Sequence, residues 1–297
     1  MNALSRPHLG FVGAGKVSNT LARLFYGVDY PISAIYNRTP TRAKVLAEVV
    51  GAEVVEHISD VVRMSDLTII AVADDALVEI DGAIPVENWE GKAVIHTSGV
   101  RNREALKHFE QCGALTGSLH PAFPFADGGL APYDLKDVVF AVEASDERLR
   151  EMLHTLVGAI GGHVFDISTD QKILYHAALV FASNYTVTLY SIAERILKRI
   201  GATGGLPSDI LNPLMSGMLH NLKTRGAVSG LTGPLVRRDM RTIAEHVDRL
   251  TDMDEALAAL YKQLAVQTLP LLAARNIDTH SIEVILGRSA DYADDHS

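Results

Sequence analysis

Residues 9–22 read LGFVGAGKVSNTLA, an apolar run followed by a glycine-rich turn and a segment that permits a helix. The apolar run predicts a buried strand, and the turn leads into a helix whose first N–H groups have no partner within the helix. Such a helix start attracts a phosphate group. We therefore expect the residues of the turn and the helix start to contact a phosphorylated cofactor: Gly13, Ala14, Gly15, Lys16, Val17 and Ser18.

The spacing of the glycines favours a dinucleotide over a nucleoside triphosphate. Gly13 permits the tight turn, Gly15 lets a pyrophosphate approach the backbone, and a small residue at the third position, here Ser18, lets the helix lie close to the strand. Residues 10–16 also match the start of a P-loop, whose next residue must be a hydroxyl that holds magnesium. That residue is Val17, which argues against a triphosphate site.

The triplet Asn37-Arg38-Thr39 follows a second predicted strand, residues 31–36. An NAD-binding fold carries a carboxylate at this place for the ribose 2′-hydroxyl, and none is present. An arginine beside small polar side chains would instead bind a 2′-phosphate through charge-assisted hydrogen bonds. The triplet predicts NADP(H) over NAD(H); the alternative interpretation is a polar turn before a helix that starts near Thr41.

Bulk composition excludes several classes of protein. The 297 residues suffice for two domains, and 47% hydrophobic with 21% charged residues is typical of a soluble globular protein. A net charge of −9 argues against a nucleic-acid surface. Cys112 is the only cysteine, so we expect no disulfide framework. No apolar run suits a membrane span and residues 1–8 lack a signal-peptide core, which favours a cytoplasmic protein.

Strand and helix patterns alternate up to residue 167. Apolar segments at 54–56, 67–72, 92–97, 115–121, 137–144 and 162–167 predict strands, with a helix over 146–160. This alternation predicts a doubly wound parallel sheet, an NADP-binding Rossmann domain over residues 1–167 in an α/β protein. Ligands lie at the carboxyl ends of such strands, so we expect Ala73, Asp74 and Ser98 to border the cofactor.

Helical spacing replaces this alternation from residue 168 onward. Apolar residues recur from Asp170 to Ile200, with Ser168 or Thr169 available as N-cap and Gly201 as stop. Further helices are predicted at 208–224, 234–250 and 254–274, with Pro270 bending or ending the last. We therefore expect an all-helical domain over residues 168–297 that serves substrate binding and dimerisation.

Hydride transfer to a carbonyl or an imine needs a proton donor and a group that holds the substrate. His176 and Asn184 lie eight residues apart on the long predicted helix, about 80° apart around its axis, so both could border one cleft. His120, before Pro121 at a strand end, could contact the substrate or the nicotinamide. The alternatives are a core histidine for His176 and a cap of the sheet for His120.

Residues 231–239 contain Arg237 and Arg238 behind a Gly-Pro helix start. Such a start directs backbone N–H groups and nearby arginines toward one point, which predicts an anionic substrate. The alternative places both arginines on a solvated face.

The other histidines, His96, His220 and His246 among them, lack metal-ligand spacing, so no metal is predicted. A Gly-x-Ser-x-Gly elbow is also missing, which argues against a serine hydrolase.

The sequence resembles the Rossmann-like proteins with a C-terminal DUF2520 domain, a branch of the 6-phosphogluconate dehydrogenase-like superfamily. The resemblance spans nearly the whole chain. It rests on residues 10–22, 37–39, 118–121, 175–178 with 183–185, and 231–234 with 238–239.

Relatives in this superfamily include ketopantoate reductase, pyrroline-5-carboxylate reductase, hydroxyisobutyrate dehydrogenase and prephenate dehydrogenase. In the first and third, a catalytic lysine lies on the inner helix of the second domain, with asparagines on following turns. The resemblance puts His176 where that lysine would stand and Asn184 at an asparagine two turns on. Val180 stands where ketopantoate reductase has another asparagine.

The resemblance implies an NADP-dependent oxidoreductase that reduces a small 2-oxo acid such as 2-dehydropantoate. In this hypothesis His176 donates the proton, Asn184 orients the oxygen and Arg238 holds the carboxylate. The alternatives are the oxidative direction, an imine or another small carboxylate of the prephenate or pyrroline-5-carboxylate type, and a dinucleotide-binding protein without turnover. The apolar helical domain predicts a homodimer.

Overall fold

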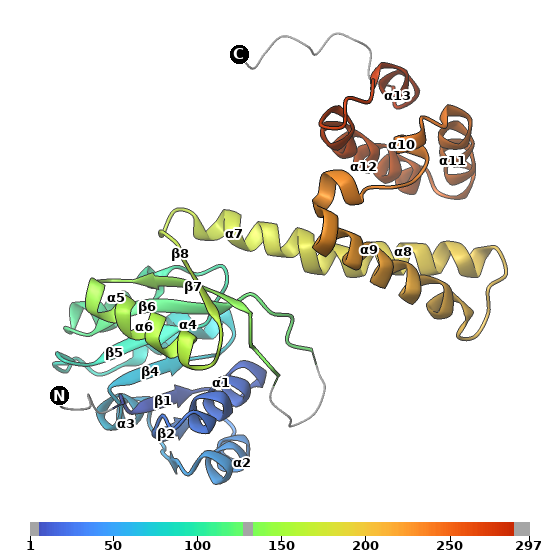
Figure 1. Cartoon of the computed structure of the whole chain (residues 1–297). Helices are drawn as coiled ribbons and strands as arrows, with labels where there is room; N and C mark the ends of the chain where they lie inside the picture. The colour runs from blue at the N-terminus through green and yellow to red at the C-terminus, as the bar shows by residue number, and fades with distance from the viewer. Residues whose placement is uncertain (1–5, 127–132, 288–297) are drawn as a thin grey trace. The chain divides into compact units, whose positions relative to one another are not determined.

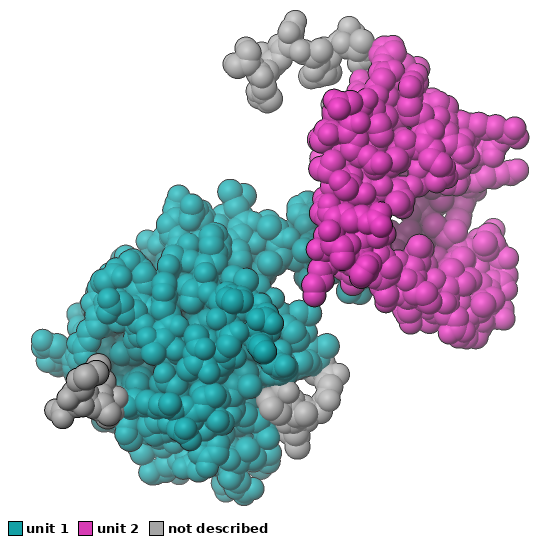
Figure 2. All heavy atoms as spheres, viewed as in Figure 1, with its two compact units in different colours: residues 1–187 teal, residues 188–297 magenta. Residues whose placement is uncertain are grey.

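The protein is described by a computed structural model that covers residues 6–126 and 133–287 (Figure 1). It divides into two compact units, residues 1–187 and residues 188–297, and each is described by itself (Figure 2). The sequence also predicts a loop over residues 122–132, a segment rich in proline, glycine and phenylalanine, and its residues 127–132 lie outside the described residues.

An eight-stranded sheet forms the centre of the first unit, with strand order β3-β2-β1-β4-β5-β6-β7-β8. The strands are β1 (Leu9–Val12), β2 (Ile32–Tyr36), β3 (Glu53–Val54), β4 (Leu67–Ile70), β5 (Ala93–His96), β6 (Leu115–Pro121), β7 (Val139–Ala144) and β8 (His163–Asp166). Neighbouring strands are parallel except β6 and β7. The predicted Rossmann-type α/β fold is confirmed, and the carboxyl ends of β1, β2, β4, β5 and β6 share one edge.

The predicted parallel sheet contains one antiparallel pair: β7 runs antiparallel to β6, with His120 opposite Ala141. A parallel neighbour needs a crossover connection, usually a helix. The described part of the connection, residues 122–126 and 133–138, contains no helix. β7 lies directly beside β6, and the following helix α6 (Glu147–Ala159) then connects β7 to its parallel neighbour β8.

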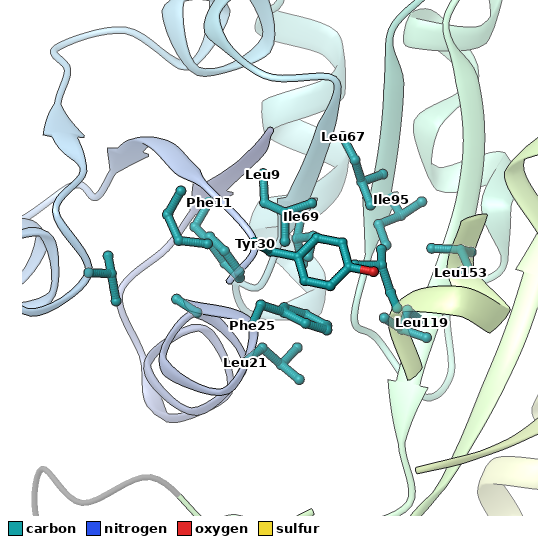
Figure 3. Packing of buried hydrophobic residues seen from close by; sticks show 14 of the residues in the cluster. Leu9, Phe11, Leu21, Phe25, Tyr30, Leu67, Ile69, Ile95, Leu119 and Leu153 are labelled. Atoms are coloured by element: carbon teal, nitrogen blue, oxygen red, sulfur yellow. The ribbon is translucent and has the colours of Figure 1, made fainter. Parts of the chain in front are cut away.

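Helices pack on the sheet through apolar side chains. On α1 (Lys16–Gly27), Leu21 and Phe25 are fully buried, and Leu153 of α6 is buried with them in one cluster that includes Phe11 and Ile69 (Figure 3). Each such side chain contributes roughly 1.5–3 kcal/mol when it leaves water. The remaining helices before residue 170 are α2 (Pro40–Val50), α3 (Ile58–Met64), α4 (Asp74–Ala83), the 3-10 helix η1 (Arg103–Leu106) and α5 (Lys107–Gln111).

The long helix predicted from Asp170 to Ile200 is divided into three segments. These are α7 (Lys172–Leu179), a π-helical turn η2 (Val180–Asn184) and α8 (Tyr185–Arg199). Neither Ser168 nor Thr169 is the N-cap, because the Ser168 hydroxyl donates to Asp170 and the Thr169 hydroxyl donates to Glu143. Gln171 takes the N-cap position, and the helical residues end before Gly201 as predicted.

The second unit is helical in its described part. It contains α9 (Leu206–Gly230), α10 (Pro234–Arg237), α11 (Met240–Met253), α12 (Glu255–Ala273) and α13 (His280–Ile285). The single helix predicted over 234–250 is broken at Arg238, which has φ 54°, and Asp239 caps α11 by accepting the Thr242 N–H. Pro270 lies inside α12, which continues to Ala273.

The predicted domain boundary between residues 167 and 168 falls directly after β8. The compact units divide later, between residues 187 and 188 and inside α8. The assignment of residues 168–187 to a helical domain therefore stays a prediction. A membrane-spanning helix, long and apolar enough to cross a bilayer, is not found in residues 6–126 or 133–287.

Candidate active site

The turn between β1 and α1 lies directly against the end of β4. Gly13 has φ 102°, and a Cβ atom on it would lie 2.3 Å from the carbonyl oxygen of Ala71. Its own N–H donates to the carbonyl of Tyr36, at 2.8 Å. Only glycine fits both this backbone conformation and this close approach. Gly13 therefore holds the turn at the carboxyl ends of β2 and β4.

Asn37 ties this turn to the loop after β2. Its Oδ1 accepts the Ala14 N–H at 3.0 Å, and its Nδ2 donates to the carbonyl of Thr39 at 2.9 Å. Asn37 is thus placed between two of the predicted cofactor loops. Arg38 and Thr39 beside it are exposed, where α2 begins.

The N-terminus of α1 is open above the turn. Gly15 is the N-cap, and apart from its chain neighbours no atom of the described residues lies within 4 Å of where its Cβ would be. Lys16 begins the helix, and Val17 packs partly buried on the core. Ser18 is fully buried, so a small side chain is required where α1 approaches the sheet. This backbone cradle fits the diphosphate of a dinucleotide.

The loops after β4 and β5 supply the other predicted cofactor residues. Ala73 is the N-cap of α4 and Asp74 lies in its first turn. Ser98 follows β5, and its hydroxyl accepts the N–H groups of Val100, at 3.3 Å, and Arg101, at 2.9 Å. Because β4 and β5 are parallel neighbours, both loops lie on the same edge of the sheet as the glycine turn.

His120 and His176, predicted from separate parts of the chain, face one point. A Cβ atom on Gly99 would lie 2.8 Å from Nε2 of His120 and 2.8 Å from Nδ1 of His176. The ring centroids are 6.5 Å apart. Within the described residues, the buried Nδ1 of His176 has no hydrogen-bond partner. We call these two residues the histidine pair; their ring nitrogens converge beside the backbone of Gly99.

Tyr175 contacts the other side of the His120 ring. Its hydroxyl lies 3.0 Å from Nδ1 of His120, and the rings meet edge to face. Burial raises the pKa of Tyr175 to about 12, so the hydroxyl keeps its proton near neutral pH. Sequence reasoning named Tyr175 only as part of a resembling segment and missed this contact, whose partners are 55 positions apart.

A buried ion pair between Lys172 and Glu143 lies at the start of α7. Lys172 is 1% exposed and Glu143 is 4% exposed, and Nζ lies 3.8 Å from Oε2. Lys172 also donates to the hydroxyl of Ser118. Glu143 further accepts from the hydroxyl of Thr169 at 2.6 Å and from the N–H of Arg103 at 2.9 Å. Both charges therefore have partners, as buried charges require.

Sequence reasoning missed this ion pair. Ser118 and Lys172 are 54 positions apart, and no short motif links either residue to Glu143. A carboxylate inside the apolar run of β7 was the only available signal. A charge in such a run requires a buried partner, although the run does not name it.

The charge of Lys172, in the buried ion pair with Glu143, shifts the pKa of the neighbouring histidine His120. Burial, together with the charges of Lys172 and His176, lowers the pKa of His120 to about 4, and Asp74 opposes part of this shift. Burial lowers the pKa of Lys172 itself to about 8, against the opposing effect of Glu143 and Asp74. His120 is consequently neutral near pH 7, while most Lys172 side chains remain charged.

His96 at the end of β5 is a structural core residue. Its Nε2 lies 2.9 Å from the carbonyl of Asn102, and its Nδ1 accepts the Ser98 N–H at 3.2 Å. Burial, together with the Lys172 charge, lowers the pKa of His96 to about 3. Both ring nitrogens are therefore used in holding the loop that contains Ser98 and Gly99.

Asn184, Arg237 and Arg238 complete the set of predicted site residues. Asn184 ends the π-helical turn and is exposed; this turn breaks the regular 3.6-residue spacing from which its direction was predicted. Arg237 and Arg238 belong to the second unit and are exposed, and Arg238 forms an ion pair with Asp278 at 3.3 Å. In the part of the chain described, no group of three or more His, Cys, Asp or Glu could hold a metal ion.

Two families match separate parts of the chain. Residues 8–99 match the family described as NADP oxidoreductase coenzyme F420-dependent, and residues 138–268 match the domain of unknown function DUF2520. No curated protein sequence matches at a significant level. The family match over the glycine turn confirms the predicted NADP(H) cofactor.

Several solved structures are similar over most of the chain. A candidate NADP oxidoreductase, BF3122 from Bacteroides fragilis, is 26% identical with a TM-score of 0.70, covering 89% of this chain and 98% of its own. Protein TM1727 from Thermotoga maritima is 26% identical with a TM-score of 0.73, covering 90% and 99%. A reductive aminase from Aspergillus terreus, in complex with NADPH and ethyl-5-oxohexanoate, shares the fold at 15% identity and a TM-score of 0.58, covering 95% and 92%.

These matches agree with the open glycine turn and the sheet edge described above, and with the predicted resemblance. The chain is thus similar to NADP oxidoreductases over residues 8–99 and to DUF2520 over residues 138–268, and the two structures at 26% identity extend the similarity over most of its length.

Proposed function

We propose that this protein reduces a small 2-oxo acid with NADPH, and that 2-dehydropantoate is the leading candidate substrate. The observation that carries the proposal is the convergence of His120 Nε2 and His176 Nδ1 beside Gly99. Two polar groups in a half-buried site, on the sheet edge that also holds the glycine turn, suit an oxygen atom that gains negative charge during reduction.

The cofactor would lie along this edge. The glycine turn would hold the diphosphate, Asn37, Arg38 and Thr39 the adenosine ribose with its 2′-phosphate, and Ala73, Asp74 and Ser98 the nicotinamide half. When bound, NADPH supplies the hydride. The open N-terminus of α1 and the exposed guanidinium of Arg38 support this arrangement.

The chain's own residues handle the oxygen and the carboxylate. As the carbonyl carbon gains the hydride, the electron pair of the C=O bond moves to oxygen, which then takes a proton from His176. Asn184 would orient this oxygen. We keep the prediction from the sequence that Arg238, with Arg237 beside it, binds the substrate carboxylate. The ion pair between Arg238 and Asp278 is exposed and therefore weak, so exchange for a substrate carboxylate costs little.

The test is the replacement His176→Ala. We expect kcat to fall by about 100-fold or more, the usual effect of removing a general acid, with the Kd for NADPH unchanged. His220→Ala, an exposed histidine on α9, is the matched control and should keep full activity. Unchanged turnover in His176→Ala would assign this residue a structural role.

An imine is the second candidate substrate, because a C=N bond accepts a hydride and a proton in the same geometry and a reductive aminase shares the fold. A panel of 2-oxo acids, cyclic imines and hydroxy acids with NADPH or NADP⁺ separates reduction, imine reduction and oxidation. NADPH binding without turnover on any member would favour a dinucleotide-binding protein without catalysis.

A homodimer belongs to the same proposal. Exposed large apolar side chains gather on α7, η2 and α8, among them Leu174 at 74% and Phe181 at 71%, and none of the α8 residues is buried. Exposed apolar area on this scale is typical of subunit interfaces. Light scattering should give about twice the 32.1 kDa of one chain. A single-chain mass would contradict the dimer.

The cytoplasmic location predicted from the sequence is likewise part of the proposal.

A further inference from the structure

The two ring nitrogens of His120 have different surroundings. Nδ1 lies 3.0 Å from the hydroxyl of Tyr175, and Nε2 faces the point beside Gly99 that it shares with Nδ1 of His176. A neutral imidazole carries its single hydrogen on one nitrogen only. The location of that hydrogen decides whether His120 offers a donor or an acceptor beside Gly99.

The hydroxyl of Tyr175 determines which ring nitrogen of His120 carries the hydrogen. His120 Nδ1 is the hydrogen-bond partner of this hydroxyl within the described residues. If the Tyr175 hydroxyl donates to Nδ1, its proton is in a hydrogen bond and only lone pairs of the Tyr175 oxygen remain without a partner. If His120 donates instead, the half-buried Tyr175 proton has no acceptor, which is the costlier arrangement. Donation by Tyr175 leaves the imidazole hydrogen on Nε2.

The charge state of His120 follows from the groups that face it. Burial lowers its pKa to about 4, and the charges of Lys172 and His176 on α7 act in the same direction. Asp74 on α4 raises the pKa and does not restore it to the ordinary range. Glu143 on β7 holds the Lys172 ammonium, and His96 on β5 is neutral, so neither reverses the effect.

We propose that Tyr175 is a positioning residue that holds the hydrogen of neutral His120 on Nε2, so that His120 presents a hydrogen-bond donor beside Gly99. The buried Lys172–Glu143 pair supports this state by disfavouring a second proton on the ring. This inference rests on the proposed function in one respect: in a reductase, the donor polarises the carbonyl or imine bond, while the proton comes from His176.

The imidazole tautomer can be measured directly by long-range ¹H–¹⁵N NMR on protein with ¹⁵N-labelled histidine at pH 7. We expect the His120 signals to show a bare Nδ1 and a protonated Nε2. Loss of the signals in His120→Gln assigns them. In Tyr175→Phe, which removes only the hydroxyl, the share of the Nδ1–H tautomer should rise several-fold.

The chain offers a matched control. Tyr261 on α12 forms the same kind of contact with His246 on α11, with its hydroxyl 3.1 Å from Nδ1 and the rings edge to face. Tyr261→Phe should change the His246 signals and leave those of His120 unchanged. Tyr175→Phe should do the reverse, which separates a local effect from general loss of structure.

Two results would overturn the proposal: an Nδ1–H tautomer of His120 in the unsubstituted protein, or an unchanged tautomer in Tyr175→Phe. The first result is measured on the unsubstituted protein and therefore does not depend on whether a variant folds. Neither depends on turnover, so failure of the tautomer assignment is distinct from failure of the proposed reaction. Where a substrate is reduced, Tyr175→Phe should lower kcat about ten- to a hundred-fold and leave the KM for NADPH unchanged.

Discussion

The glycine turn at β1 and α1 and the histidine pair at β6 and α7 lie on the same edge of the sheet, and they are built differently. The turn depends on backbone groups: a positive φ at Gly13, an open helix start at Gly15 and one side-chain link through Asn37. The histidine pair depends on half-buried ionisable side chains, and a fully buried lysine and glutamate lie beside them.

This difference has a physical reason. A phosphate is recognised by backbone N–H groups and a helix dipole, which any short glycine-rich segment can present. Control of a proton requires side chains whose ionisation is shifted, and shifts require burial and charges from several elements. Substitutions at the histidine pair should therefore alter stability and pH response, and substitutions around the glycine turn should alter cofactor choice.

The largest effect is expected from Lys172→Met, which leaves Glu143 buried without its cation. Breaking a buried ion pair by removing one partner typically costs 3–5 kcal/mol, and we expect about this loss in the free energy of unfolding, measured in urea. The double variant Lys172→Met with Glu143→Gln should recover part of it. Lys198→Met breaks only the exposed pair with Glu194 and should cost about 1 kcal/mol or less. Equal losses in the two single variants would contradict the role of burial.

A pH effect should follow from the neutral histidines. The pKa of His120 is lowered to about 4 and that of His96 to about 3, both from 6.5. The unfolded chain therefore takes up protons below pH 6.5 that the folded chain refuses, so stability is complete above 6.5 and falls as the pH drops toward the folded values. Between pH 7 and 5 each histidine should remove about 2 kcal/mol.

Urea unfolding at both pH values measures this loss. In the variant His96→Gln, where only His120 still contributes, the unfolding free energy should decrease about half as much between pH 7 and pH 5. His57 is exposed, so the variant His57→Gln should keep the full decrease. An unfolding free energy that is the same at pH 7 and pH 5 would rule out the neutral state of both histidines.

Gly99→Ala should separate the histidine pair from the cofactor site. The added methyl would lie 2.8 Å from a ring nitrogen of each histidine, so both rings must shift. A misplacement of about 1 Å commonly costs a hundred-fold, and we expect kcat/KM to fall by about this factor while the Kd for NADPH stays constant. Gly82→Ala on α4 is the control, because no atom from another described element lies within 4 Å of the added methyl. Full activity in Gly99→Ala would disprove that the substrate reacts where the ring nitrogens of His120 and His176 converge.

The smallest effect is expected at the cofactor loop. Arg38→Ala should lower the preference for NADPH over NADH about tenfold, since one charge-assisted contact to the 2′-phosphate is lost. The ratio of Kd values from calorimetry measures this, with stability unchanged. Arg148→Ala, an exposed arginine on α6, should leave the ratio as it is. A preference that survives Arg38→Ala would refute the assignment of the 2′-phosphate to this loop.

Several elements were predictable because their signals are local. The bounds of β6 were predicted to the residue, and the Gly13 turn, the Asn37-Arg38-Thr39 loop after β2 and the change from strands to helices after β8 each follow from a few neighbouring positions. The structure departs from the predicted details where a neighbour distant in sequence intervenes. Thr169 bonds Glu143 instead of capping α7, and β7 pairs antiparallel with β6.

The sequence by itself determined the Rossmann-type fold, the helical region and the NADP(H) cofactor, because periodicity, turn glycines and a missing acid act over a few residues. Only the tertiary structure decided that His120, Tyr175 and His176 meet beside Gly99 and that Lys172 and Glu143 form a buried ion pair. Those contacts join positions up to 77 residues apart, from Gly99 to His176. Ionisation and hydrogen bonding depend on distance in space, which local sequence patterns do not encode.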